Sequence, residues 1–252
     1  MNDLVSIVIP VHNVRKYITQ TIESVRTQSY TNWELILTED CSTDGTRELL
    51  AQYLDELSDD RIRVIWLDEN VGAAAARNLG VENSRGRFVA YLDADDIWEK
   101  DKLLCQLQFM RQTGAAFCFT NYEFADESGR GTGKVVHVPA TLTYRRALRN
   151  TTIFTSTVML DTQQIPRNEI RMPDIRSEDT ALWWQLLRMG YTAYGFQETY
   201  VFYRRPARSL SSNKLSAVKR IWNLYRRSEK LGVLYSCYNF FFWAFRAVRR
   251  RV

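Results

Sequence analysis

The first half of the chain alternates between short apolar runs and amphipathic stretches, and this pattern constrains the fold more than any other feature. The run Val5–Pro10 is rich in β-branched residues and closes on a proline, which is typical of a buried strand. Ile18, Ile22 and Val25 follow at helical spacing. The same order recurs, so we expect strands at 5–10, 33–37, 62–67 and 88–92, and helices at 15–28, 43–57, 72–83 and 98–112. Such alternation predicts an α/β fold with a mostly parallel sheet flanked by helices.

Polar residues directly follow each expected strand. Three of the four loops carry carboxylates, at Glu39–Asp40, Asp68–Glu69 and Asp93–Asp96. In a parallel α/β sheet, ligands bind beyond the carboxyl ends of the strands. Carboxylates gathered at one edge are costly unless a cation or hydrogen-bond donors lie among them. We therefore expect a ligand site at this edge of the sheet.

The sharpest motif is Asp93-Ala94-Asp95, at the end of the fourth expected strand. Two carboxylates one residue apart can reach a divalent ion and a ribose together. Mg²⁺ and Mn²⁺ prefer oxygen ligands and usually keep waters and substrate phosphates around them, so the ion would neutralise a diphosphate leaving group. Aspartates at strand ends also serve as plain turn or cap residues, and the motif alone leaves both interpretations open.

Four segments together resemble glycosyltransferase family 2, which has the GT-A fold. They are Val5–Asn13, Asp40–Thr46, Asn70–Gly80 and Leu92–Asp96, and they occur in the order and spacing of the family over most of the first 110 residues. The resemblance implies a metal-dependent glycosyltransferase that uses a nucleotide-sugar, with a UDP-sugar as the expected donor and Mn²⁺ or Mg²⁺ as the cofactor.

The resemblance also implies roles for single residues. Pro10, Val11, Asn13 and Asp40 match positions that hold the nucleobase and ribose, and Asn70 belongs to the same binding set. Arg77 matches an arginine near the pyrophosphate, Asp93 the contact to ribose and metal, and Asp95 the metal ligand.

Each of these roles has an alternative from local structure. Asp40 could cap the helix that follows it, and Arg77 could be a surface residue on a helix. Two departures from the family pattern are visible, because His12 stands where tyrosine is frequent and Glu39-Asp40-Cys41 where Asp-Asp-Gly is frequent.

The acidic pair Glu178-Asp179 precedes an apolar helical stretch in the second half. An inverting transfer needs a carboxylate opposite the leaving diphosphate. The pair resembles the acidic signature whose aspartate deprotonates the acceptor hydroxyl, so Asp179 is the expected base and Glu178 would position it or hold the acceptor. An acidic N-terminus for the helix is the alternative, because the helix dipole favours it.

The last forty residues differ from the rest in charge. From Lys214 onward the chain has ten basic residues against Glu229 alone, a net charge of +9, which leaves −4 for the remainder of a chain whose total is +5. Aromatic residues alternate with these cations, and the apolar stretch 231–245 is shorter than the roughly 20 residues that span a bilayer. We expect an interfacial helix on an anionic membrane surface, with packing on the protein as the alternative.

We therefore expect a single GT-A catalytic domain at 1–213 and a basic, aromatic helical tail at 214–252. The domain would comprise a nucleotide-sugar-binding half at 1–112 and an acceptor-binding half at 113–213. No secretory signal is visible, and four scattered cysteines without a CxxC pair fit a reducing cytoplasm. The expected location is the inner face of the cell membrane. The basic loop 203–205 and 208–213 fits a lid over the diphosphate as well as a solvated connector.

Similarity between residues 133–195 and the teichuronic acid, capsule and O-antigen biosynthesis glycosyltransferases points to an inverting transfer onto a lipid-linked glycan. Two alternatives belong to other classes. A nucleotidyltransferase would carry a glycine-rich phosphate loop after the first strand, where Pro10-Val11-His12-Asn13 contains no glycine. A nucleic-acid-binding protein could use the basic tail, but the acidic body and the lack of a recognised module argue against nucleic acid as a partner.

Overall fold

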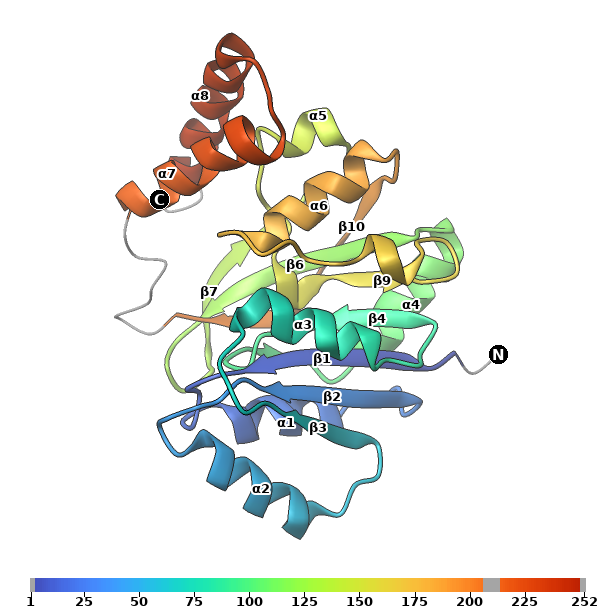
Figure 1. Cartoon of the computed structure of the whole chain (residues 1–252). Coiled ribbons are helices and arrows are strands. Elements are labelled where there is room, and N and C mark those ends of the chain that lie inside the picture. Colours follow the sequence, from blue (N-terminus) through green and yellow to red (C-terminus); the bar gives the residue numbers. More distant parts are fainter. Residues whose placement is uncertain (1–2, 206–213, 250–252) are drawn as a thin grey trace.

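The structure, a computed structural model, describes residues 3–205 and 214–249 and confirms the α/β fold (Figure 1). Ten strands form one sheet in the order β3-β2-β1-β4-β9-β6-β10-β5, with β7 beside β6 and β8 beside β10. The strands are β1 (Val5–Val11), β2 (Trp33–Glu39), β3 (Ile62–Trp66), β4 (Phe88–Tyr91), β5 (Ile97–Trp98), β6 (Phe117–Ala125), β7 (Gly131–Val136), β8 (Thr141–Leu142), β9 (Met159–Asp161) and β10 (Ala193–Arg204).

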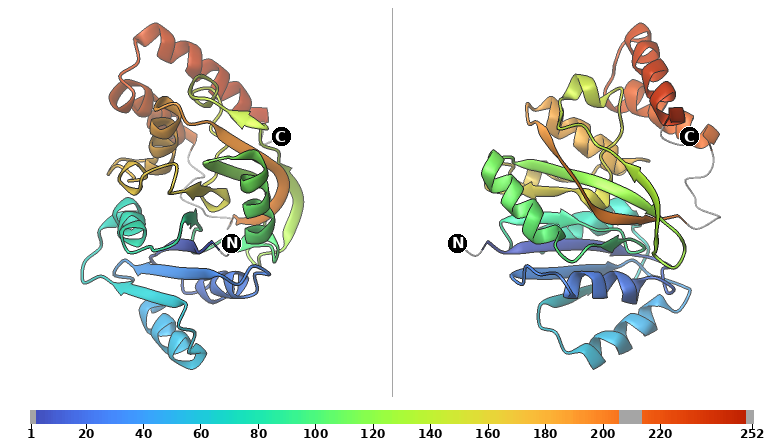
Figure 2. Two further views of the ribbon diagram at one scale, coloured as in Figure 1. Left: turned by 90° about the vertical axis from the view of Figure 1, so that its right-hand side faces the viewer. Right: turned by 180° about the vertical axis from the view of Figure 1, so that it is seen from behind.

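Helices cover both faces of this sheet (Figure 2). The α-helices are α1 (Ile18–Arg26), α2 (Thr46–Leu57), α3 (Gly72–Glu82), α4 (Lys102–Thr113), α5 (Tyr144–Ala147), α6 (Glu178–Arg188), α7 (Lys214–Asn223) and α8 (Val233–Arg249). Short 3₁₀ turns occur at η1 (Thr155–Thr157) and η2 (Arg167–Glu169), and η4 (Leu224–Ser228) is a π-helical turn.

The sheet is parallel in the first half, as the sequence predicts, and mixed as a whole. Strand β1 pairs in parallel with β2 and β4, so the carboxyl ends of these three strands meet at one edge. Strand β9 then runs antiparallel between β4 and β6, and β10 pairs in parallel with β6. The antiparallel pairs arise because the second half contributes hairpins and long connections in place of β-α-β crossovers.

Alternation along the strands divides the interior into two hydrophobic cores. Ile7 and Ile9 of β1 point to the core under α1, α2 and α4. Val8, between them, points to the opposite core, which α3, α6 and the C-terminal helices cover. Side chains of a strand point alternately to its two faces, so a strand buried on both faces has an unbroken apolar sequence. This explains why β1 appears in the sequence as a continuous apolar run.

Two predicted elements are corrected by the structure. The helix expected at 98–112 begins at Lys102, because Trp98 belongs to the short strand β5 and pairs with Val201 of β10. The sequence from Thr155 to Leu160 also predicts a strand, but η1 occupies its first residues and only β9 joins the sheet. The glycine-rich sequence at 126–133 predicts a hairpin tip, and β6 and β7 do pair antiparallel across it.

The tail forms two helices that are separated near Gly232, as expected, and the π turn η4 ends the first of them. The tail packs on α6, where the ring of Tyr225 stacks on Trp184 with centroids 5.3 Å apart. Ile221, Leu224 and Trp243 join the same hydrophobic core. The tail therefore shares a core with the rest of the chain, and the division at residues 213 and 214 stays a prediction.

Candidate active site

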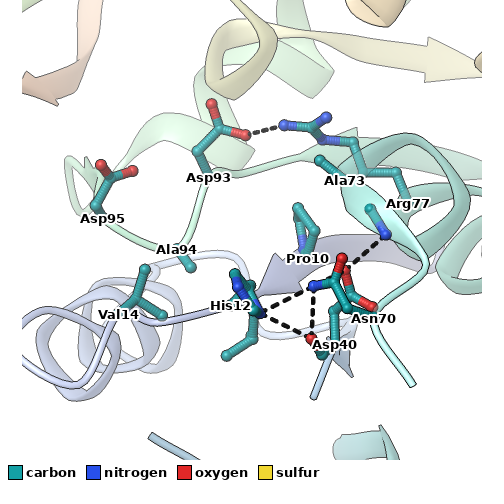
Figure 3. A pocket seen from close by; sticks show the side chains of 12 residues that line it. Pro10, His12, Val14, Asp40, Asn70, Ala73, Arg77, Asp93, Ala94 and Asp95 are labelled. Carbon is teal, nitrogen blue, oxygen red and sulfur yellow. Dashed lines mark hydrogen bonds and ion pairs between the residues drawn. The ribbon is translucent and has the colours of Figure 1, made fainter. Parts of the chain in front are cut away.

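A cavity of about 330 Å³ lies at the carboxyl ends of β1, β2 and β4 (Figure 3). Seven residues predicted from the sequence line it: Pro10, Val11, Asp40, Asn70, Arg77, Asp93 and Asp95. The rest of the lining consists of His12 and of small or apolar residues that carry no chemical signal in the sequence: Val14, Gly72, Ala73 and Ala94. The cavity thus gathers Asp40, Asp93 and Asp95 with a buried arginine, whereas the loop carboxylates Asp68 and Glu69 do not line it.

Asp40 fixes one wall of the cavity and is 2% exposed. Its carboxylate accepts hydrogen bonds from the backbone N–H groups of Val71 (2.6 Å) and Gly72 (2.9 Å), at the start of α3. The side chain of Asn70 donates to the Asp40 carbonyl oxygen at 3.0 Å and to its carboxylate at 3.2 Å. Asp40 therefore orders the loop before α3, and the suggestion that it caps the next helix, α2, is wrong. Gly45 occupies the N-cap position of α2, and the N–H of Thr46, the first residue of the helix, donates to Asp44 Oδ1.

His12 is exposed on the cavity wall and is oriented by its neighbours. Its Nδ1 lies 2.8 Å from the Asp40 carbonyl oxygen and its Nε2 lies 2.9 Å from Asn13 Nδ2. The Asn70 side-chain nitrogen also lies 3.1 Å from Nδ1, so three contacts orient the ring. Asn13 is not among the residues that line the cavity, and its Oδ1 accepts the N–H of Thr43.

Arg77 connects the cavity to the acidic pair of the second half. One guanidinium nitrogen donates to Asp93 Oδ1 at 2.6 Å and another to Glu178 Oε1 at 2.8 Å. Arg77 is 7% exposed, so the suggestion of an ordinary surface arginine is wrong. Burial would lower the pKa of Arg77, but the charges of Asp93 and Glu178 outweigh it and raise the pKa, which keeps the guanidinium charged.

Asp95 presents its carboxylate to the cavity and lies close to that of Asp93. Among the described residues, no other residue donates a hydrogen bond to its carboxylate, which points into the cavity (Figure 3). Burial, and then the neighbouring charge of Asp93, raise the pKa of Asp95 to about 6. Within the described chain, no cluster of three or more His, Cys, Asp or Glu could hold an ion unaided. The donor set therefore fits a cation that takes most of its ligands from a substrate diphosphate and water.

Asp96 is the buried anchor of this loop, although no separate feature of the sequence marks its role. It is 0% exposed, and its carboxylate accepts hydrogen bonds from the Ser156 hydroxyl (2.5 Å) and the Arg204 N–H (3.1 Å). Ser156 Oγ also accepts the backbone N–H of Asp93 at 3.0 Å. Asp96 and Ser156 together fix the backbone that presents Asp93 and Asp95.

A second cavity of about 420 Å³ contains the acidic pair Glu178 and Asp179. Both lie in the first turn of α6, and Glu178 is engaged by Arg77. Asp179 accepts hydrogen bonds from the Thr155 hydroxyl (3.1 Å) and from the N–H of Thr180 (2.6 Å). Four aromatic residues line the same cavity: Tyr122, Phe154, Tyr203 and Trp243. Aromatic faces beside a carboxylate suit a sugar, which has apolar C–H faces and polar edges.

The basic loop after β10 divides into two parts. Arg204 is 1% exposed and is held by structural contacts, because its backbone N–H donates to Asp96 and its guanidinium donates to Gln20. The guanidinium of Arg205 lies 5.2 Å from the ring centroid of Phe124. The segment 208–213, for which a lid and a connector were both considered, lies outside the described residues.

Comparison with known proteins agrees with this geometry. Residues 6–162 match the family model "Glycosyl transferase family 2". The chain is 46% identical over 250 residues to the "Putative teichuronic acid biosynthesis glycosyltransferase TuaG" of Bacillus subtilis (strain 168), covering 99% of this chain and 98% of that protein. It is 36% identical over 222 residues to the "UDP-Glc:alpha-D-GlcNAc-diphosphoundecaprenol beta-1,3-glucosyltransferase WfgD" of Escherichia coli, covering 88% and 85%.

Among solved structures, the mannosyltransferase PcManGT from Pyrobaculum calidifontis in complex with GDP-Man and Mn²⁺ has the same fold. Its TM-score is 0.70 at 16% identity, and the match covers 90% of this chain and 64% of that one. The family match leaves a nucleotidyltransferase without support. The chain therefore belongs to glycosyltransferase family 2, and it is a glycosyltransferase.

Proposed function

We propose that this enzyme transfers a sugar, with inversion, from a UDP-sugar to a lipid-linked glycan acceptor in bacterial surface polysaccharide biosynthesis. The observation that carries this proposal is the pair of cavities joined by Arg77. One cavity presents the Asp93 and Asp95 carboxylates, and the other presents Asp179. Arg77 contacts Asp93 on one side and Glu178 on the other. A donor and an acceptor bound in the two cavities would meet beside this arginine.

The donor would occupy the cavity of Asp40, Asn70 and Arg77, with its diphosphate toward Asp93 and Asp95. Mn²⁺ or Mg²⁺ would be held by Asp95 together with Asp93, and when bound it supplies positive charge to the leaving diphosphate. PcManGT, which shares the fold, was solved with GDP-Man and Mn²⁺, and the name of WfgD specifies UDP-Glc. These names support a nucleotide-sugar, with UDP as the nucleotide.

Asp179 would act as the base that takes the proton from the acceptor hydroxyl. Thr155 and the N–H of Thr180 fix its carboxylate, and this rigidity suits a group that must meet one hydroxyl. Glu178 is already paired with Arg77, so it acts as a positioning residue. A hydroxyl activated from this side attacks the sugar opposite the leaving diphosphate, which inverts the anomeric centre.

The tail would hold the enzyme on a membrane surface, because α8 has an exposed apolar face in addition to the face that packs on the core. Ser236 and Asn239 lie on its buried side, while Leu234, Tyr238 and Phe241 are exposed. The exposed apolar residues recur at the spacing of one helix face. The net charge of the tail, +9, complements anionic lipid. No helix in the described part of the chain has the length and apolarity to cross a membrane.

Two further observations support a peripheral enzyme on the inner face of the cell membrane. All four cysteines are free thiols, which suits a reducing compartment. The name of WfgD specifies an acceptor on diphosphoundecaprenol, and that of TuaG specifies teichuronic acid biosynthesis. A lipid-linked acceptor would be met at the membrane surface that α8 contacts.

The first test is nucleotide release from UDP-, GDP- and dTDP-sugars with Mn²⁺ or Mg²⁺ and with a chelator. Asp95→Ala should abolish release of the nucleotide that the wild type releases, and the matched control Asp55→Ala, on the exposed side of α2, should not. Asp179→Asn should keep donor binding but lose transfer to a lipid-linked acceptor. Release that persists in Asp95→Ala and in chelator would reject the metal site, and an unchanged anomeric configuration in the product would reject inversion.

A further inference from the structure

A third cavity, of about 470 Å³, lies between the loop before α6 and the C-terminal helices. Apolar side chains of Pro173, Ile175 and Leu224 form part of its wall. Three arginines complete the lining: Arg176 before α6, Arg220 on α7 and Arg227 on η4. Such a combination of apolar wall and clustered cations is unusual for a pocket that has no ligand to bind.

Arg220 belongs to two cavities, because it also lines the cavity of Asp179. It therefore stands where the polar, aromatic cavity and the mainly apolar cavity adjoin. Figure 1 shows α7 beside the first turn of α6, the element that carries Asp179. The cavity of Asp179 has aromatic and acidic residues in its lining, Arg220 lies at the junction, and the other cavity combines apolar residues with Arg176 and Arg227.

The three arginines have no charge partner in the part of the chain that the structure describes. None of them forms an ion pair with a described carboxylate, in contrast to Arg188 nearby, which pairs with Glu229 at 3.1 Å. The Nε–H group of Arg220 is buried and donates to no acceptor among the described residues. A buried N–H without an acceptor costs free energy, so a ligand that supplies oxygens there would be bound favourably.

We propose that Arg220, with Arg176 and Arg227, binds the diphosphate of the lipid-linked acceptor, and that the apolar cavity holds the first segment of its lipid chain. This inference rests on the proposed function, since it assumes a sugar acceptor in the cavity of Asp179. The order of groups in such an acceptor is sugar, diphosphate and lipid. The sugar would lie in the aromatic and acidic cavity of Asp179, the diphosphate would lie at Arg220 where the two cavities adjoin, and the lipid would lie along the apolar wall of the other cavity.

The proposal gives the tail a role in substrate recognition. Arg220 and Arg227 both come from the segment after residue 213, whereas Asp179 comes from α6. Guanidinium groups bind phosphate through paired N–H donors, which lysine lacks. The tail would therefore distinguish an acceptor that carries a diphosphate from a free glycan, in addition to contacting the membrane.

The test measures binding of farnesyl diphosphate by calorimetry to the full chain, saturated with UDP and Mn²⁺ so that the donor cavity is filled. We expect binding by the wild type and a loss of about tenfold or more in Arg220→Ala, because charge-assisted hydrogen bonds to phosphate are lost. Arg220→Lys should recover part of the affinity. Arg145→Ala removes the same charge from exposed α5, outside both cavities, and should bind like the wild type. Arg227→Ala, at an exposed site, serves as the second variant if Arg220→Ala unfolds.

Three results would overturn the proposal. The first is equal affinity in the wild type, Arg220→Ala and Arg227→Ala. The second is a loss of affinity for farnesol as large as the loss for farnesyl diphosphate. Farnesol has no diphosphate, so its binding should be insensitive to both substitutions. The third is a loss confined to phosphatidylglycerol vesicles, which would assign the arginines to bilayer lipid.

Turnover provides an independent readout. For an acceptor with sugar, diphosphate and a short lipid, Arg220→Ala should raise KM about tenfold or more and leave kcat unchanged. For an alkyl glycoside of the same sugar, which has no phosphate, KM should stay unchanged. A uniform loss on both acceptors would indicate a structural role only and overturn the proposal. Failure of the proposed function would instead appear as nucleotide release that is independent of Asp95. Because the calorimetry requires no turnover, it tests the arginines separately from the reaction.

Discussion

Replacing Arg77 with alanine tests whether one guanidinium joins the two substrate cavities. The side chain of Arg77 is 9% exposed, and its partners Asp93 and Glu178 are 25% and 21% exposed. Arg77→Ala would leave two carboxylates half-buried and close to one another without a shared cation. The expected result is therefore a loss of stability together with a loss of donor affinity, since Asp93 would no longer be held in place.

The size of the effect follows from these exposures. Breaking a buried ion pair by removing one partner costs about 3–5 kcal/mol. Water can reach both carboxylates here, so we expect the lower end of that range, about 3 kcal/mol. For a chain of this size, 1 kcal/mol corresponds to a shift in Tm of about 2–4 °C, so the expected decrease is about 6–12 °C. The Tm of Arg77→Lys should lie between those of the wild type and Arg77→Ala, because one ammonium group cannot reproduce two directed N–H contacts.

Thermal unfolding, with urea unfolding as a second method, measures the change. The matched control is Arg171→Ala, because Arg171 pairs with Glu82 at the surface, where the two side chains are 67% and 49% exposed. An exposed pair contributes less than about 1 kcal/mol, so this control should scarcely move Tm. Equal Tm values for Arg77→Ala and Arg171→Ala would refute the bridging role. Donor calorimetry on the folded Arg77→Ala protein then shows whether Asp93 depends on Arg77 for its position.

Three further predictions concern the tail, acid stability and backbone packing. Leu234→Glu or Phe241→Glu should leave Tm unchanged, because these side chains are 88% and 68% exposed. Either substitution should lower co-sedimentation of the protein with anionic vesicles. An undiminished bound fraction would contradict membrane contact by α8. Burial opposes ionisation of Glu34, but hydrogen bonds from Ser6 and Arg85 outweigh burial and lower the pKa of Glu34. The ionised Glu34 therefore stabilises the fold above the ordinary pKa of 4.5, and this stabilisation is lost as the pH falls below that value. Glu34→Gln should therefore unfold more readily than the wild type at pH 7, and urea titrations should show this difference shrinking toward pH 3; a constant difference would contradict the assignment. Gly195→Ala would place a Cβ 2.0 Å from the Pro139 carbonyl oxygen and should lower the free energy of unfolding in urea by more than about 2 kcal/mol. In Gly232→Ala the added Cβ meets nothing within 4 Å, so the free energy of unfolding should change little. Equal changes in the two variants would show that β10 shifts freely.

The sequence predicted the first half of the fold because its determinants are local. Strands buried on both faces have continuous apolar sequences, and each is followed by a helix of recognisable periodicity. The second half depends on contacts between distant segments. Strand β10 was not predicted, because register shifts between Phe196 and Phe202 interrupt its alternation against β6. Trp98 pairs across more than a hundred residues with Val201, and no local pattern announces that pairing.

The candidate site shows the same division. The predicted residues of the donor cavity follow strand ends, and a parallel sheet places such residues together by its topology. The ion pairs of Arg77 could not be foreseen, because Glu178 lies about a hundred residues later in the chain. Asp96 had been grouped with its neighbours, and only burial against Ser156 and Arg204 separates its role from theirs. The aromatic wall around Asp179 likewise comes from four separate segments of sequence.

The exposed apolar face of α8 has a consequence for the length of glycan that the enzyme can extend. Trp243 of this helix lines the cavity of Asp179, while Phe241, two residues earlier, faces outward. With that outer face resting on a bilayer, the reactive hydroxyl would be held about one helix diameter from the lipid, roughly 10–12 Å. A long glycan would carry its terminal sugar beyond this height, whereas the first sugars after the diphosphate would lie within it. The thickness of a single helix would thus restrict the enzyme to an early step in chain assembly.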